Sequence, residues 1–190
     1  MTKQSNQNQK SSSTIDLMES YPCQLRHLNL SCYGCCGVKF SNQEDVESDI
    51  WLNTQDLNKI RKNEIDKLSN DEKLQKFRDR FANDEVSPSG VCLNLTEFGN
   101  GCTACPLHPL VNEIVDKKET VAPNSDLRVG YCDTKYECDT LKSWELMQLS
   151  QREKFVEFVK SKNYSNYDYS MKNDSGELIK EFISKKEIVE

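Results

Sequence analysis

Cysteine spacing is the feature of this sequence that points most directly to chemistry. Seven of the nine cysteines fall into an early group, a middle group and one later position. They are Cys32, Cys35 and Cys36, then Cys92, Cys102 and Cys105, and finally Cys132. A Cys-x-x-Cys turn directs two sulfurs at one centre, and a second turn far along the chain completes the coordination shell. The spacing therefore predicts a thiolate-bound metal.

The early group contains a turn that suits metal chelation. Cys32 and Cys35 have chelate spacing, and Gly34 permits the tight turn that brings their sulfurs together. Cys36 is adjacent to Cys35, and neighbouring side chains are expected to point in different directions. Cys36 is therefore either the ligand of a different metal of a cluster or a buried apolar thiol.

The middle group ends where a helix is expected to begin. Cys102, Cys105 and His108 recur at steps of three, and Pro109 suits the first position of a helix that reaches Val115. Amide groups at a helix N-terminus lower the pKa of a thiol and favour metal binding. His108 is either a further ligand or a helix cap that faces solvent.

Cys92 and Cys132 complete the predicted set. The alternation of residues 91–95 predicts a strand, with Cys92 on the face opposite its apolar residues, as suits a ligand. Cys132 is a single thiol whose assignment depends on the other cysteines. Cys23 and Cys138 have no partner at a diagnostic spacing and are expected to lie outside the site, although recruitment of either stays open. The predicted metal ligands are Cys32, Cys35, Cys36, Cys92, Cys102, Cys105, His108 and Cys132.

The ligand set is compatible with two kinds of metal centre. Seven thiols and one histidine are enough for two tetrahedral zinc ions, or for one four-iron cluster with thiols to spare. Adjacent cysteines and the Cys105-Pro106 step favour an iron–sulfur cluster. A closed shell made only of protein ligands favours structural zinc. The sequence leaves this choice open.

Composition restricts the classes of partner. The 190 residues suit one domain with extensions, and 36% hydrophobic with 29% charged residues gives a lean core that a metal would help to stabilise. The formal net charge of -6 argues against general binding to nucleic acid or to an anionic membrane.

The redox setting is inferred from the same sequence. No secretory signal or transmembrane stretch is visible, so we expect a cytoplasmic protein with reduced thiols. Nine cysteines cannot all pair within one chain, and a disulfide scaffold is accordingly disfavoured.

The patterns predict a mainly α fold with short β or irregular segments, organised as a small metal-stabilised domain with cysteine-rich loops. Residues 1–20 are expected to form a disordered polar tail, residues 21–140 the cysteine-cluster domain, and residues 141–190 a helical extension packing on it. Within this plan, the run Glu44–Asp49 is expected to be a solvated acidic loop.

Helix caps and apolar spacing give three further expectations. Asn53 or Thr54 is expected to begin one helix, and residues 71–81 are expected to form a second. Residues 163–170 read as a polar-aromatic linker whose tyrosines pack over the domain.

At these residues the chain resembles the YkgJ-type cysteine-cluster family, described as zinc- or iron-chelating proteins. The matching pieces are Ser31-Cys32-Tyr33-Gly34-Cys35-Cys36, Val91-Cys92-Leu93-Asn94-Leu95, Gly101-Cys102 with Leu107-His108, and Tyr131-Cys132. The resemblance spans residues 30–132. It departs from the family's pattern in the extra Cys105 and in the missing basic-Pro pair before the last cysteine, for which the nearest pieces are Pro123 and Arg128.

Two functions follow from this reading. The first is a metal-binding domain without catalysis, whose surface meets an unidentified protein partner. The second is an iron–sulfur enzyme or electron carrier. Some iron–sulfur methylases look similar to this chain in their cysteine motif, so methyl transfer is one reaction that such an enzyme would catalyse. The sequence contains no Ser/His/Asp set, P-loop or Gly-rich dinucleotide turn that would specify a reaction. Whether the protein is an enzyme is left open.

Overall fold

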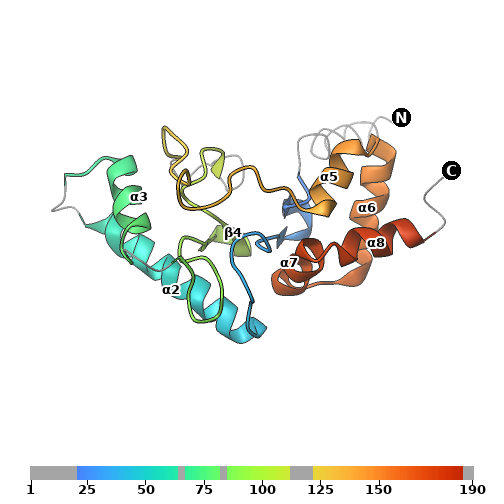
Figure 1. Ribbon diagram of the computed structural model, residues 1–190, viewed down its shortest axis with the longest axis horizontal. Coiled ribbons are helices and arrows are strands. Elements are labelled where there is room, and N and C mark those ends of the chain that lie inside the picture. Colours follow the sequence, from blue (N-terminus) through green and yellow to red (C-terminus); the bar gives the residue numbers. More distant parts are fainter. Residues whose placement is uncertain (1–20, 64–66, 82–84, 112–121, 186–190) are drawn as a thin grey trace, which may run out of the picture. The chain divides into compact units, whose positions relative to one another are not determined.

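The computed structural model describes residues 21–63, 67–81, 85–111 and 122–185. Within these residues the chain is mainly helical, with six α-helices and two short two-stranded sheets, which confirms the predicted class (Figure 1). The chain divides into two compact units, which we describe separately. Unit 1 consists of Met1–Cys32 and Glu137–Glu190, and unit 2 is Tyr33–Tyr136. The predicted tail of residues 1–20 lies outside the described residues, as does most of the predicted helix after Pro109.

Unit 2 begins with a long helix, α2 (Gln43–Lys62), that starts well before the predicted position. The Asn42 side chain caps it by accepting a hydrogen bond from the Asp45 amide over 3.0 Å. Glu44 and Asp45 then lie in the first turn, where carboxylates interact favourably with the helix dipole. The expectations of an acidic loop over residues 44–49 and of a helix start at Asn53 or Thr54 are therefore wrong.

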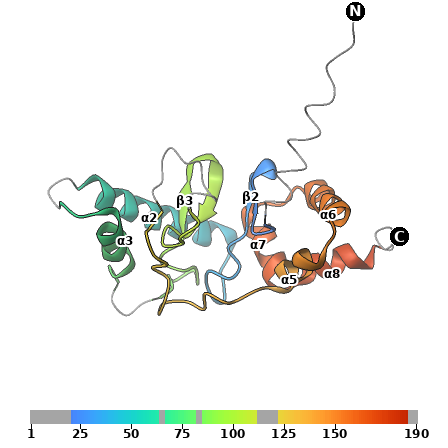
Figure 2. The ribbon, with the colours of Figure 1, turned by 90° about the horizontal axis from the view of Figure 1, so that it is seen from above.

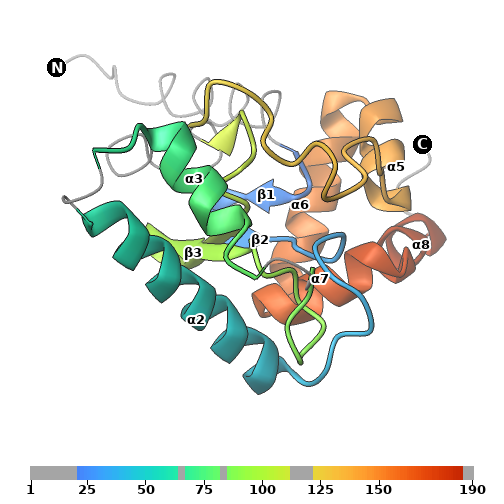
Figure 3. The ribbon, with the colours of Figure 1, turned by 60° about the vertical axis from the view of Figure 1, so that its left-hand side comes forward.

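A second helix, α3 (Asn70–Arg78), packs against α2 and confirms the helix predicted for residues 71–81 to within a few residues (Figure 3). Ser69 and Glu72 form a reciprocal capping box at its start. Five buried residues form the core between these helices and the later loops: Leu57, Leu74, Phe77, Leu107 and Leu127.

A small hairpin leads to the middle cysteine group. Its strands are β3 (Thr96–Phe98) and β4 (Cys102–Ala104), joined by the 3-10 turn η2 (Gly99–Gly101). The strands are antiparallel, with Phe98 opposite Cys102. The strand predicted for residues 91–95 is wrong, because this segment makes only isolated bridges at Val91 and Cys92 before it turns.

Unit 1 combines an N-terminal hairpin with four C-terminal helices. The hairpin strands are β1 (Gln24–Leu25) and β2 (Leu30–Ser31), joined by the 3-10 turn η1 (Arg26–Leu28). The helices are α5 (Asp139–Leu146), α6 (Leu149–Lys162), α7 (Asn166–Asp174) and α8 (Glu177–Ser184) (Figure 2). Residues 21–32 thus pack with the C-terminal helices, and the chain returns to unit 1 at Glu137, near the predicted boundary after residue 140.

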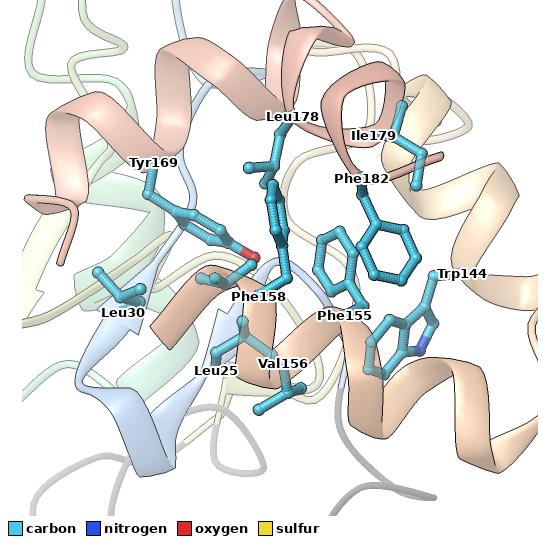
Figure 4. Packing of buried hydrophobic residues seen from close by; sticks show 11 residues of the cluster. Leu25, Leu30, Trp144, Phe155, Val156, Phe158, Tyr169, Leu178, Ile179 and Phe182 are labelled. Carbon is cyan, nitrogen blue, oxygen red and sulfur yellow. The ribbon is translucent and has the colours of Figure 1, made fainter. Parts of the chain in front are cut away.

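The linker predicted for residues 163–170 is in fact the start of α7. Ser165 caps this helix by accepting a hydrogen bond from the Asp168 amide over 3.0 Å. Tyr169 is fully buried in the core of unit 1, where Leu25 and Leu30 of the hairpin lie near it (Figure 4). The other members of this core include Trp144, Phe155, Val156, Phe158, Val159, Leu178, Ile179 and Phe182. None of the described helices is long and apolar enough to cross a membrane.

Candidate metal centre

Cys35 and Cys36 lie in a tight turn that begins at Tyr33. The Cys36 amide donates to the Tyr33 carbonyl oxygen over 2.8 Å, and the two cysteine Sγ atoms lie 3.9 Å apart. The expectation that these adjacent side chains point in different directions is wrong, because the chain turns here and brings both sulfurs together. Zinc–sulfur bonds of about 2.3 Å in a tetrahedral shell place sulfurs about 3.8 Å apart. This pair therefore has the spacing of two ligands of one ion.

Cys92 lies directly opposite Cys36 on a neighbouring segment. The Cys92 amide donates to the Cys36 carbonyl oxygen over 2.8 Å, and the next pair, Gly37 and Val91, forms an antiparallel bridge. Side chains of directly opposed residues lie on the same face of an antiparallel pair. The bridge therefore brings two thiols from distant parts of the sequence to one face.

Two glycines permit these segments to approach closely. A side chain at Gly37 would overlap the Gly90 carbonyl oxygen, and one at Gly90 would overlap the Val38 carbonyl oxygen. Gly90 also has a φ of +85°, in the left-handed region that other residues rarely adopt. The approach of Cys92 to Cys36 thus depends on glycine at both positions.

A half-buried arginine, Arg80, fixes the Cys92 segment on α2 and α3. The Asn53 side-chain amide donates to the Cys92 carbonyl oxygen over 3.2 Å. Arg80 in turn donates to Asn53 Oδ1 over 2.8 Å and to the Leu93 carbonyl oxygen. It also forms an ion pair with Asp56 over 3.4 Å. The backbone that carries Cys92 is therefore held from both sides by one connected network.

Cys105 follows β4 and packs, half-buried, against the core between α2 and α3. Burial raises the pKa of its thiol to about 12, and the nearby Cys92 thiol adds to the increase. The Leu107 amide opposes that increase by donating toward the sulfur. A turn continues from here, with the His108 amide donating to the Cys105 carbonyl oxygen over 3.2 Å.

Cys132 lies on an exposed turn that is joined to the Cys105 segment. The Leu127 amide donates to the Leu107 carbonyl oxygen over 3.3 Å, and the Cys132 amide donates to the Arg128 carbonyl oxygen over 3.3 Å. Arg128 forms a 2.7 Å ion pair with Asp126. Burial raises the pKa of the Cys132 thiol, whereas the Arg128 charge lowers it.

The electrostatics of unit 2 show that these thiols are neighbours. The pKa of Cys36 lies well above its usual value because of its hydrogen bond with Cys35, burial, and the charges of Cys35, Cys105 and Cys92. Burial raises the pKa of Cys92, and Cys132 adds to it. Cys35 likewise raises the pKa of Cys132. Five thiols from four separate segments therefore act on one another within unit 2.

The five thiols are close but are not arranged as a finished coordination shell. Across the residues that the structure describes, no three Cys, His, Asp or Glu side chains converge in a way that would hold a metal ion. Their chemistry nonetheless fits a soft metal, since thiolates are its preferred ligands and the Cys35–Cys36 pair has the required spacing.

The other predicted ligands have different surroundings. Cys32 belongs to unit 1, whereas Cys35 and Cys36 belong to unit 2. Cys102 is on β4 opposite Phe98, and it is not among the main influences on the pKa of the Cys36, Cys92 or Cys105 thiols. Their assignment as metal ligands stays a prediction.

His108 and two arginines complete the description of the site. The His108 Nδ1 atom accepts a hydrogen bond from the Leu110 amide over 3.0 Å, as a capping side chain does. The sequence reasoning did not identify Arg80 and Arg128 as part of the site. The position of Arg128, four residues before Cys132, could have indicated that it lies near this thiol. Nothing in the sequence around Arg80 indicated that it lies near Cys92.

Comparison with known proteins adds no family assignment. No protein-family model, curated protein or solved structure matches this chain. The resemblance to the YkgJ-type family therefore stays a prediction based on the cysteine motifs.

Proposed function

We propose that unit 2 binds a metal ion through the thiolates of Cys35, Cys36, Cys92, Cys105 and Cys132. The observation that supports this most strongly is the gathering of five thiols from four segments. Backbone hydrogen bonds join Cys92 to Cys36 and the Cys132 segment to the Cys105 segment. Cys35, Cys92, Cys105 and Cys132 each raise the pKa of at least one other thiol of the set, and the pKa of Cys36 is raised by three of them. A set of partly buried and exposed thiols gathered in this way is suited to act as metal ligands.

Backbone amides directed at the sulfurs support the thiolate form. The Asn94 amide donates to Cys92 Sγ over 3.4 Å and lowers the pKa of that thiol. The Leu107 amide does the same for Cys105, so both sulfurs interact with the residue two positions later. A hydrogen bond to the charged form favours that form. These amides would stabilise thiolates once a metal displaces the protons.

Two arginines would offset the negative charge of a thiolate centre. One divalent ion with four thiolates carries a net charge of -2. Arg128 acts on Cys105 and Cys132, and Arg80 acts on Cys92. Both guanidinium groups are half-buried, where their interaction with thiolate is less screened by water than at the surface.

The 3.9 Å separation of the Cys35 and Cys36 sulfurs favours a single zinc ion. It matches the edge of one tetrahedral shell, whereas the cysteines of a four-iron cluster each bind a different iron. A zinc ion held by four thiolates cross-links the chain and leaves no open position for a substrate. Cys35, Cys36 and Cys92 would supply three ligands, and Cys105 or Cys132 the fourth.

Metal content and thiolate absorption test this proposal. The full chain, purified without oxygen, should contain about one zinc per chain, and added Cd²⁺ should give the ultraviolet band of cadmium–thiolate bonds. Cys92→Ser should lose both signals. Cys138→Ser in unit 1 is the matched control and should keep them.

Two outcomes would change the conclusion. Full zinc content in Cys92→Ser would show that these thiols are not the ligands. A brown protein with iron and sulfide would instead support the iron–sulfur reading, including an electron carrier or enzyme.

A further inference from the structure

Three cysteines lie in unit 1, outside the proposed metal centre, and two of them face each other. The Cys32 amide donates to the Cys23 carbonyl oxygen over 2.8 Å. This bond continues the register of the β1–β2 hairpin, in which Gln24 is opposite Ser31. Cys23 and Cys32 are therefore directly opposed at the open end of the hairpin.

The two thiols lie on the same face of the hairpin. Cys23 precedes β1 and Cys32 follows β2, and side chains of directly opposed residues in an antiparallel pair lie on the same face. Leu25 and Leu30 of the hairpin are buried in the core of unit 1, and Cys32 packs against that core. The two cysteines are half-buried, which leaves them within reach of small reagents.

Tyr169 on α7 provides an independent indication of their position. Its hydroxyl donates to the carbonyl oxygen of Pro22, the residue before Cys23, over 2.5 Å. Burial raises the pKa of Tyr169, and the charges of Cys32 and then Cys23 raise it further. Both thiols therefore lie near the same buried hydroxyl group.

We propose that Cys23 and Cys32 are a redox pair that forms a reversible disulfide by exchange with a low-molecular-weight disulfide. Directly opposed, hydrogen-bonded residues have Cα atoms about 5.5 Å apart, and a disulfide joins Cα atoms about 4.4–6.8 Å apart. Cys32 is then a thiol of unit 1 and not a ligand of the unit 2 metal.

The exchange balances without a further reactant. One cysteine thiolate attacks a sulfur of the small disulfide, whose S–S bond breaks and releases one small thiol. The second cysteine thiolate attacks the mixed disulfide, so the Cys23–Cys32 bond forms and a second small thiol leaves. Two electrons pass from the cysteine pair to the small disulfide, and the two cysteine protons go to the two released thiols.

The register also predicts that the bond is easily reduced. In hydrogen-bonded opposed residues the distance between the two Cβ atoms is at the upper end of the range of about 4.5–5.5 Å. A relaxed disulfide needs a Cβ–Cβ distance of about 3.5–4.5 Å. The strands must therefore approach each other when the bond forms. A disulfide that requires such movement is typical of reversible pairs rather than of permanent cross-links.

Peptide mapping of the wild-type protein tests the pairing. The full chain is equilibrated with oxidised glutathione, alkylated, and digested with trypsin and chymotrypsin. Cleavage after Arg26 and Tyr33 separates Cys23, Cys32 and Cys35 onto different peptides. The predominant cross-link should join the Cys23 and Cys32 peptides, and dithiothreitol should remove it.

Variants separate this proposal from the metal proposal. Cys32→Ser should abolish the cross-link and leave the zinc content unchanged, whereas Cys92→Ser should lose zinc and keep the cross-link. The pairing is overturned if glutathione produces no cross-link in the wild type, or mainly one to Cys138. Loss of zinc in Cys32→Ser would show that Cys32 is a metal ligand and would overturn the redox-pair proposal, even if the unit 2 thiols also bind zinc.

Discussion

Arg80 joins Asn53 and the Leu93 carbonyl oxygen beside Cys92 to α3, and methionine at this site tests the scaffold of the proposed metal centre. Its guanidinium donates to Asn53 Oδ1 over 2.8 Å, to the Phe77 carbonyl oxygen over 2.7 Å and to the Leu93 carbonyl oxygen. It also stacks 3.8 Å above the Phe77 ring. Arg80→Met keeps an apolar stem over that ring and removes every donor.

The size of the effect follows from these contacts. A hydrogen bond from a charged donor contributes about 1.5–3 kcal/mol, so loss of the three costs about 4.5–9 kcal/mol. Burial lowers the pKa of Arg80, and the charges of Asp56 and Cys92 oppose this decrease. Keeping the charged guanidinium partly out of water therefore costs free energy, and methionine removes that cost. We expect a net loss of about 3 kcal/mol in local stability, or roughly 100-fold faster amide exchange.

Hydrogen exchange read by mass spectrometry measures this effect separately in the two units. Peptides from α3 and residues 85–95 should exchange faster in Arg80→Met, while peptides from α6 should not change. Arg61→Met is the matched control, because the buried Arg61 Nη2 atom has no hydrogen-bond partner among the described residues. Equal exchange in the two variants would refute the role given to the Arg80 network.

Four further outcomes follow from the site. Zinc affinity should fall as pH falls between about pH 8 and 6, because each bound thiol must release a proton; chelator competition measures it. In the metal-free chain, burial raises the pKa of Cys105 from 9.0 to about 12, so the stability that it contributes is present below pH 9 and lost toward pH 12; Cys105→Ala should flatten this loss in alkaline denaturation curves. Cys105→Ser and Cys132→Ser should each keep most of the zinc, since either can be the fourth ligand, and only the double variant should lose it by metal analysis. Gly90→Ala should cost about 3 kcal/mol, against about 1 kcal/mol for Gly130→Ala, in denaturant titrations, because both have positive φ but only Gly90 abuts another segment.

The sequence predicted a helix best where apolar residues recur at helical spacing. Residues 71–81 had such a stripe, and α3 lies there, with Ser69 as a cap that was not predicted. Residues 44–49 were misread because carboxylates suit a solvated loop and also the first turn of a helix. The cap that decides between these, Asn42, has the same residue type as many loop positions. Tertiary packing of α2 against β3 resolved the ambiguity.

The site was predictable in its residue types and less so in its pairings. Spacing placed Cys32, Cys35 and Cys36 in one group, took Cys32 and Cys35 as the chelating pair, and indicated Cys92 and Cys105 as further thiols. It did not show that Cys36 would lie opposite Cys92, because a bridge between distant segments depends on register and on close contact at Gly37 and Gly90. The same limit hid the pairing of Cys32 with Cys23.

Unit 1 is built from two stretches of chain that are separated by the whole of unit 2. The Ser31 amide bonds to Asn166, and the Tyr169 hydroxyl bonds to Pro22, across 135 and 147 positions of sequence respectively. At a synthesis rate of about 5–20 residues per second, the hairpin waits roughly 7–30 s for α7 to emerge from the ribosome. Unit 2 is continuous, so all five of its clustered cysteines are synthesised before α7. The order of translation therefore completes the proposed metal ligands of unit 2 before α7 can join the hairpin and close the core of unit 1 around Tyr169.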